Sequence, residues 1–151
     1  MHPIHETIKM NNKTIGIIGS GTMGSGIAQL VAVSECNVIL FDANQDAAEY
    51  AKEKVLKILE GLVKKNKISE KDAEAALARI RIADSLMEFN GCDLVIEAIV
   101  EDLAIKKDLF KNLEAICKPS CVLATNTSSI SITSIASACK KTRQGYRNTL
   151  F

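Results

Sequence analysis

The stretch TIGIIGSGTMGSGIAQLVA, residues 14–32, decides the fold of this chain. It opens with mostly β-branched residues, continues through Gly19, Gly21 and Gly24, and ends with apolar residues at helical spacing. This pattern predicts a strand, a tight turn and a helix. Gly19 allows a sharp turn off the strand, Gly21 leaves the backbone bare, and Gly24 lets the helix approach the strand closely.

Such a turn presents free backbone N–H groups at a helix N-terminus, where a pyrophosphate can bind. Glycine-rich turns also serve packing alone, but here a second apolar run, 38–41, ends in Asp42, eighteen residues after Gly24. An acid at the end of the second strand accepts hydrogen bonds from both adenosine ribose hydroxyls and repels a 2′-phosphate. No Arg follows Asp42 closely. The sequence therefore predicts an NAD site rather than an NADP site.

Composition limits the other possibilities. The chain has 151 residues, of which 47% are hydrophobic, and this suffices for one domain with its own core. The net charge is +1 and charges of both signs are interspersed, which disfavours nucleic acid and membrane surfaces as partners. No apolar run reaches membrane-spanning length, and residues 1–12 lack the apolar centre of a secretory signal. We therefore expect a cytoplasmic protein.

Metal ligands are few in this sequence. The five cysteines include no CxxC pair, and the two histidines, His2 and His5, precede the first predicted strand. We expect no metal site, and we expect the cysteines to be buried or half-buried thiols in a reducing compartment.

The rest of the chain alternates between strand and helix patterns. Strands are expected over 14–19, 37–42, 80–83, 93–99 and 122–125, and helices over 22–34, 46–67, 73–78, 84–90, 103–117 and 130–138. This order predicts an α/β fold of the Rossmann type, with a doubly wound, mainly parallel sheet. The helices 46–67 and 73–78 form a helical hairpin arm inserted before the third strand, and Ser69 with Asp72 resembles a capping box.

Several polar residues stand at the predicted carboxyl ends of strands, where ligands bind in such sheets. Glu97 interrupts an apolar strand, so it either meets a partner at the end of the sheet or has a function. Glu101 is either a site residue or an ordinary helix cap. The polar run 126–129 follows the fifth strand and faces the same crevice. For the lysines within 64–67, a solvated helix end is a simpler interpretation than a ligand site.

Three runs resemble one enzyme family: GIIGSGTMGSGIAQLVA (16–32), DLVIEAIVEDLAIKK (93–107) and LATNTSSISITSIA (123–136). Over residues 13–141 the chain resembles the NAD-binding half of the 3-hydroxyacyl-CoA dehydrogenases, especially the bacterial 3-hydroxybutyryl-CoA dehydrogenases. The hairpin arm is also similar to this family's. Two alternatives stay open. One is a stand-alone NAD-binding or sensing module without catalysis; the other is a related β-hydroxyacid dehydrogenase, although those lack the NTSS run and the long arm.

For the cofactor, the resemblance implies a role for each matching residue. Asp42 would hold the adenosine ribose, while Glu101 and Lys106 would lie by the nicotinamide. The pyrophosphate would be cradled by Gly19, Gly21, Thr22, Met23 and Gly24.

For the substrate, the resemblance implies a catalytic Ser128 that touches both the nicotinamide and the substrate hydroxyl. Asn126 would help to shape that pocket. Lys64 and Lys65 would face the phosphates of an acyl-CoA substrate, although the family often has a hydroxyl residue on the part of the arm where Ile58 stands.

In this family a His general base, oriented by a Glu, takes the hydroxyl proton while hydride moves between C3 and the nicotinamide. Neither residue matches within 13–141. We therefore expect a truncated form that lacks the C-terminal helical domain and is inactive alone. The full-length form would be a homodimer, and the truncated form would self-associate through apolar surface that the missing domain covers.

The two ends of the chain do not follow the family pattern. Residues 1–12 form an N-terminal extension with no assigned function, and the tail 142–151, TRQGYRNTLF, is expected to be a non-family sequence. A coding string for this tail, read one nucleotide later, gives PDKVIGIHFF, which resembles the family and places His at the position of Thr149. A frameshift explains the tail; the alternative is a natural fragment with an unrelated end.

Overall fold

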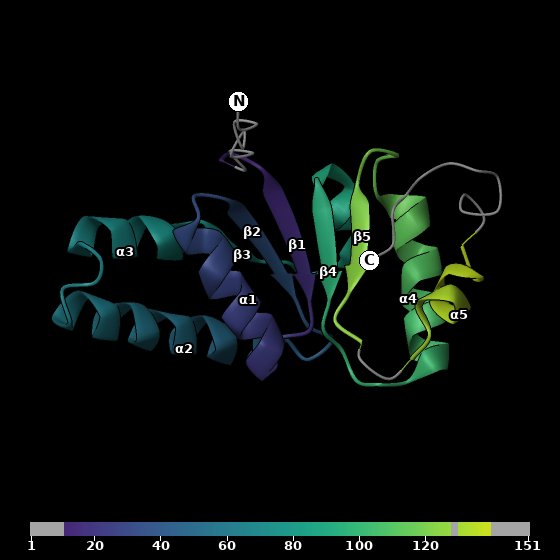
Figure 1. Cartoon of the computed structure of the whole chain (residues 1–151), viewed down its shortest axis with the longest axis horizontal. Coiled ribbons are helices and arrows are strands. Elements are labelled where there is room, and N and C mark those ends of the chain that lie inside the picture. Colours follow the sequence, from purple (N-terminus) through teal and green to yellow (C-terminus); the bar gives the residue numbers. More distant parts are fainter. Residues whose placement is uncertain (1–10, 128–129, 140–151) are drawn as a thin grey trace, which may run out of the picture.

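In a computed structural model, residues 11–127 and 130–139 are described, and five strands form one sheet (Figure 1). The strand order is β3-β2-β1-β4-β5. The strands are β1 (Thr14–Ile18), β2 (Asn37–Phe41), β3 (Ile80–Ile82), β4 (Leu94–Glu97) and β5 (Val122–Thr125). All four pairings are parallel, with Ile15 level with both Val38 and Leu94. The predicted Rossmann-type fold is confirmed, and in the described ranges the sheet is wholly parallel.

Helices cover both faces of the sheet. They are α1 (Thr22–Val33), α2 (Gln45–Lys64), α3 (Glu70–Ala78), the 3₁₀ helix η1 (Leu86–Gly91), α4 (Leu103–Ile116) and α5 (Ile132–Ala136). Helices α1, α2 and α3 share one apolar cluster with the strands, and η1, α4 and α5 share the other. The far ends of α2 and α3 project beyond the sheet as the predicted arm (Figure 1).

The arm's two helices differ from the predicted bounds for local reasons. Helix α2 ends at Lys64 rather than 67, because the chain turns left-handed at Asn66, with φ 55°, and Lys67 N donates back to Leu62 O at 2.9 Å. Helix α3 begins at Glu70 rather than 73, because the Ser69 hydroxyl accepts from the backbone N–H of Asp72 at 3.0 Å. Ser69 therefore caps a helix that begins three residues before its first predicted residue.

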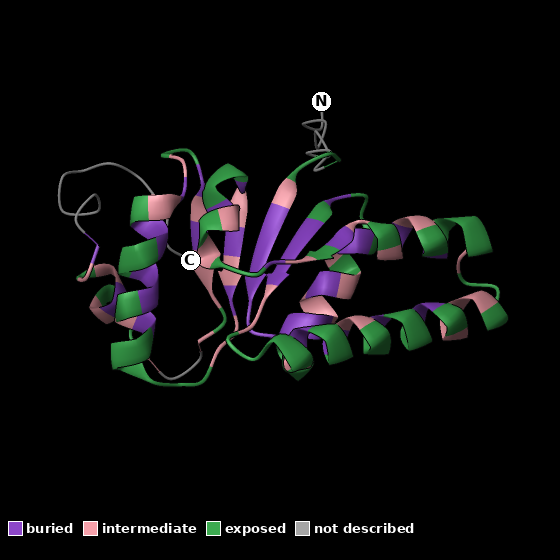
Figure 2. Cartoon of the chain, turned by 180° about the vertical axis from the view of Figure 1, so that it is seen from behind, coloured by how far each residue is buried: buried purple, intermediate pink, exposed green. Residues whose placement is uncertain are grey.

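The core lies between the sheet and the inner faces of the helices, whose outer faces are exposed (Figure 2). Gly16 on β1 is required by this packing, since a Cβ there would lie 2.4 Å from the ring of Phe89 on η1. All five cysteines are buried thiols outside any disulfide, as predicted, and burial is the main cause that raises the pKa of the Cys92 thiol to about 12. Within the described ranges, no helix combines the length and apolar character needed to cross a membrane.

Candidate functional site

The turn between β1 and α1 is built on glycines that no other residue could replace. Gly19 has φ 101°, its N–H donates to Phe41 O at 2.8 Å, and a Cβ there would lie 2.4 Å from Ala98 O. Gly24 lies so close to the turn that a Cβ would come within 1.8 Å of Gly19 O. The turn is therefore locked against the first turn of α1 on one side and the end of β4 on the other.

The N-terminus of α1 is open to an anion. Its N-cap residue, Gly21, has no side chain to cap the helix, no acidic residue occupies the first turn, and a Cβ on Gly21 would meet nothing within 4 Å. In the described part of the chain, the N–H groups of Thr22, Met23 and Gly24 have no acceptor. Unpaired donors at the positive end of the helix dipole favour a phosphate.

Asp42 follows β2 and lies beside this turn. Its Oδ2 accepts hydrogen bonds from Ser20 N at 2.9 Å and Ser20 Oγ at 2.6 Å, and its Oδ1 accepts from Asn44 N at 2.9 Å. Partial burial acts to raise the pKa of Asp42, but the hydrogen bonds from Ser20 and Asn44 outweigh it and hold the pKa below its usual value. Asp42 is therefore a fixed carboxylate at neutral pH, pointing along the same edge as the glycine turn.

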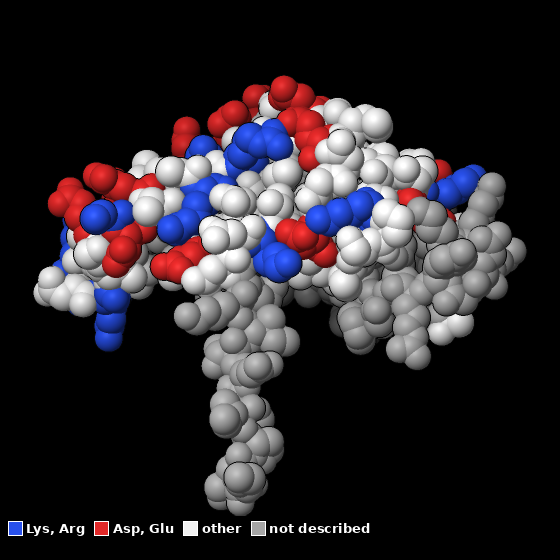
Figure 3. Space-filling model, turned by 90° about the horizontal axis from the view of Figure 1, so that it is seen from above, with Lys and Arg blue, Asp and Glu red and all other residues white. Residues whose placement is uncertain are grey.

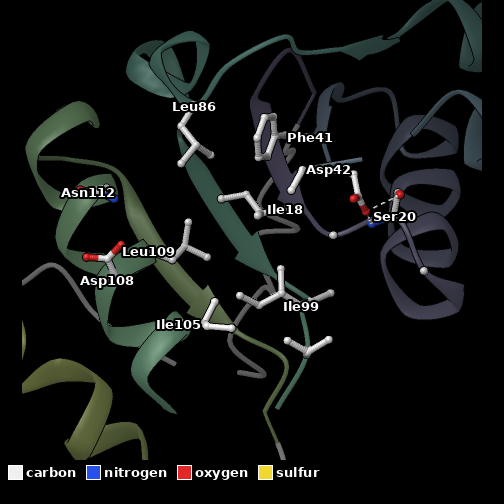
Figure 4. A pocket seen from close by; sticks show the side chains of 15 residues that line it. Ile18, Ser20, Phe41, Asp42, Leu86, Ile99, Ile105, Asp108, Leu109 and Asn112 are labelled. Atoms are coloured by element: carbon white, nitrogen blue, oxygen red, sulfur yellow. Dashed lines mark hydrogen bonds between the residues drawn. The ribbon is translucent and has the colours of Figure 1, made fainter. Parts of the chain in front are cut away.

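A cavity of about 520 Å³ opens between this edge and helix α4 (Figure 4). Asp42 and Ser20 lie at one side of it, and Asp108 and Asn112 on α4 lie at the opposite side. The walls between them are apolar and are formed by Ile18, Phe41, Leu86, Ile99, Ile105 and Leu109. The cavity lies where the strand order reverses between β1 and β4, at the carboxyl ends of parallel strands, which is where nucleotides bind in this class of sheet.

A buried ion pair lies next to the cavity. Lys106 Nζ on α4 lies 2.6 Å from Glu97 Oε1 on β4, and the side chains are 1% and 0% exposed. Glu97 also accepts from Thr125 Oγ1 at 2.5 Å and from Ile99 N at 2.8 Å. The carboxylate inside the apolar strand thus meets partners at the end of the sheet, and it ties β4, α4 and β5 together.

This ion pair extends toward the surface. Lys106 Nζ also lies 3.2 Å from Glu101 Oε1, and Thr127 Oγ1 donates to Glu101 Oε2 at 2.7 Å. Asp102, next to Glu101, caps α4 by accepting from Ile105 N at 3.0 Å. Glu101 is therefore held by the buried lysine, and the neighbouring acid takes the capping role.

The remaining predicted site residues lie in different places. Asn126 is exposed at the end of β5, and its N–H donates to Glu97 O at 2.8 Å. Ser128 lies outside the described residues. Lys64 and Lys65 are exposed at the outer end of α2, far along the arm from the glycine turn. On the face shown in Figure 3, basic and acidic side chains are interspersed, as the sequence predicts.

Sequence reasoning missed the α4 side of the cavity. Ile105, Asp108, Leu109 and Asn112 follow each other at steps of three, one and three residues, so they share one face of α4. The apolar pattern of the helix expected over 103–117 indicates its core face, but it does not single out the adjoining positions. Helical spacing in the sequence shows that these four residues share one face of the helix, but it does not show which face contacts a ligand.

Comparison with known proteins gives the family. The profile described as "3-hydroxyacyl-CoA dehydrogenase, NAD binding domain" matches residues 14–147. A probable 3-hydroxybutyryl-CoA dehydrogenase of Deinococcus radiodurans is 45% identical over 129 residues, covering 85% of this chain and 46% of that protein. One from Bacillus subtilis is 41% identical over 132 residues, covering 87% and 46%.

A solved structure agrees with these sequences. The crystal structure of 3-hydroxybutyryl-CoA dehydrogenase from Escherichia coli K12 superposes with a TM-score of 0.83 at 40% identity, covering 86% of this chain and 28% of that one. The chain thus spans about half the length of the two bacterial relatives. The glycine turn, the open helix N-terminus and the fixed carboxylate suit NAD, the cofactor of these domains. The chain belongs to the family of NAD-binding domains of the 3-hydroxyacyl-CoA dehydrogenases.

Proposed function

We propose that this chain binds NAD(H) in the cavity at the switch point and forms the cofactor half of an enzyme that interconverts 3-hydroxyacyl-CoA and 3-oxoacyl-CoA. One observation carries the proposal: an uncapped helix N-terminus and a fixed carboxylate border one apolar cavity, in a chain of this family. Proteins with 41–45% identity are named as probable 3-hydroxybutyryl-CoA dehydrogenases, so we propose a substrate of that kind.

The cofactor's phosphates and ribose have matching groups on this chain. The pyrophosphate would rest against the turn formed by Gly19 and Gly21 and on the free N–H groups of Thr22, Met23 and Gly24. Asp42 Oδ1 accepts one hydrogen bond, from Asn44 N, and so keeps acceptor capacity for a hydroxyl of the adenosine ribose. Its negative charge would oppose a 2′-phosphate, so we propose NAD rather than NADP.

The groups around Glu101 would act at the nicotinamide end. When bound, NAD supplies the hydride acceptor. Lys106 is buried and shared between Glu97 and Glu101, so its effect on the cofactor would pass through Glu101, which it holds in place. We retain Ser128 as the residue that positions the substrate hydroxyl, and Asn126 as a residue that shapes the substrate pocket.

The arm would meet the CoA portion of the substrate. Lys64 and Lys65 are exposed and carry their ammonium groups at the outer end of α2. Point charges of this kind bind phosphate groups without demanding a fixed geometry. We therefore propose that they face the phosphates of CoA.

The 151-residue chain alone is proposed to bind the cofactor without useful turnover. A serine hydroxyl is a poor base at neutral pH, the two histidines precede the first strand, and general-base assistance is typically worth about a hundredfold to ten-thousandfold. A form with the helical domain would be a homodimer. The thiols of all five cysteines, which lie outside any disulfide, fit a reducing compartment, which supports a cytoplasmic location.

We also propose that the 151-residue chain self-associates. Val100, Ile105 and Ile132 are exposed by 67%, 49% and 42%, although all three are apolar. An exposed apolar surface of this kind promotes association. Light scattering should therefore report a mass above that of a monomer at high protein concentration, and a clean monomer would contradict the idea.

Two measurements test the proposed function. Calorimetry on the 151-residue chain should give tighter binding of NADH than of NADPH; equal affinities would overturn the cofactor assignment. Acetoacetyl-CoA reduction should stay near the assay floor for this chain and appear for a gene from which one nucleotide is deleted after the Lys141 codon, which then encodes His at position 149. Absence of turnover in both, with NADH bound, would favour a cofactor-sensing module.

A further inference from the structure

The wall of the cavity opposite Asp42 carries two polar groups that the proposed function does not yet use. Asp108 and Asn112 are four residues apart on α4, so they project from the same side of the helix. Both line the cavity and both are exposed. Within residues 11–127 and 130–139, neither side chain forms an ion pair or a side-chain hydrogen bond.

The space between the two polar sides suits a flat apolar body. Phe41 and Leu86 border it on one side, and Ile99, Ile105 and Leu109 border it on the other (Figure 4). A ligand that reaches from a ribose at Asp42 across these walls to α4 must be apolar on its faces and polar at its far edge. A purine base has this character.

Asp108 and Asn112 also differ in what they can recognise. A carboxylate only accepts hydrogen bonds, whereas a side-chain amide both donates and accepts. Adenine offers an amino donor at C6 next to ring-nitrogen acceptors, and a carboxamide can pair with both. A base with an oxygen at C6 would instead place an acceptor against the carboxylate of Asp108, and this pairing is repulsive.

We propose that Asp108 and Asn112 read the 6-amino edge of adenine, so that this chain selects an adenine dinucleotide over one whose base carries oxygen at C6. The proposal rests on the proposed function, because it assumes that the dinucleotide occupies this cavity. It adds recognition of the base, which the glycine turn and Asp42 cannot supply, since these would contact only the phosphates and the sugar.

The test compares NADH with reduced nicotinamide hypoxanthine dinucleotide, whose base has an oxygen in place of the 6-amino group and therefore carries a proton on N1. Dissociation constants on the 151-residue chain are measured by calorimetry. The unsubstituted chain should bind NADH about tenfold more tightly, the low end for a hydrogen-bonded base edge because both side chains are exposed.

The variants assign this preference to residues. Asp108→Asn supplies a donor for the oxygen at C6, so the affinity ratio should fall toward one, mainly through tighter binding of the hypoxanthine analogue. Asn112→Leu should weaken both dinucleotides, because a carboxamide can turn to pair with either base edge, and it should therefore change the ratio less than Asp108→Asn does. Asp72→Asn on α3 makes the same chemical change as Asp108→Asn outside the cavity and should leave the ratio unchanged. Thermal unfolding of each variant checks that it is folded.

The outcomes separate this inference from the proposed function. Equal affinities of the two dinucleotides for the unsubstituted chain, with NADH bound, would overturn the inference alone. A ratio that neither Asp108→Asn nor Asn112→Leu changes would also overturn it. If neither dinucleotide binds, the proposed function fails and the inference fails with it.

Discussion

Replacing Lys106 by Met tests whether the buried ion pair holds the site edge together. Met keeps most of the length and apolar volume of Lys but removes its charge, so Glu97 is left 0% exposed without its cation. Breaking a buried pair in this way typically costs about 3–5 kcal/mol. Against a typical domain stability of about 5–15 kcal/mol, the loss would be about a fifth of the total or more.

Urea unfolding followed by circular dichroism measures this loss. The chain supplies a matched control in Lys118→Met, which breaks an ion pair of similar length, 2.8 Å to Asp93, whose side chains are 39% and 29% exposed. An exposed pair is worth about 0–1 kcal/mol, so Lys118→Met should change stability little. Equal costs for the two Lys→Met variants would refute the reasoning.

A second variant separates the pair's charge from its packing. In Glu97→Gln combined with Lys106→Met, both charges are gone and the amide can still accept from Ile99 N. Much of the lost stability should return, since the uncompensated charge has been removed. A double variant that is less stable than Lys106→Met would show that the carboxylate, through Thr125 and Ile99, matters more than the pair.

The sequence predicted the secondary-structure elements that local residue patterns determine. The strand, turn and helix at residues 14–32 follow from glycine positions and hydrophobic spacing, and the structure contains them within one residue of their predicted bounds. The pattern at Ser69 and Asp72 predicts a helix cap, and the Ser69 hydroxyl accepts from Asp72 N, but residues 70–72 are polar and do not show the apolar period that would place them in the helix.

The sequence did not predict which side chains meet across elements. Lys106 stands in a run of charged residues on a helix, which suggests a solvated position, yet it is 0% exposed. Its burial depends on how α4 crosses the ends of β4 and β5. There Lys106 pairs with Glu97, which also accepts a hydrogen bond from Thr125 Oγ1. The same crossing turns Asp108 toward the cavity. Such rotations depend on the packed core and not on the local pattern.

Three further predictions follow from single contacts. Asp42→Ala should weaken NADH binding by about 1–3 kcal/mol, the cost of unmade hydrogen bonds to a charged group, as measured by calorimetry; unchanged affinity would place the ribose elsewhere. Gly24→Ala should destabilise the chain, because the new Cβ would lie 1.8 Å from a carbonyl of the glycine turn, whereas Gly26→Ala, with nothing within 4 Å, should stabilise α1 by about 0.5–1 kcal/mol; thermal unfolding ranks the two. Finally, the hydrogen bond from Lys118 is the main cause that holds the pKa of Asp93 below its usual 3.8. A lowered folded-state pKa contributes stability that is present above 3.8 and lost as the pH falls through the lowered value. Asp93→Asn should therefore reduce stability at neutral pH, and the difference from the unsubstituted chain should narrow as the pH falls below 3.8. Urea unfolding curves that stay equally far apart at neutral and at acidic pH would show that the charge of Asp93 does not stabilise the fold.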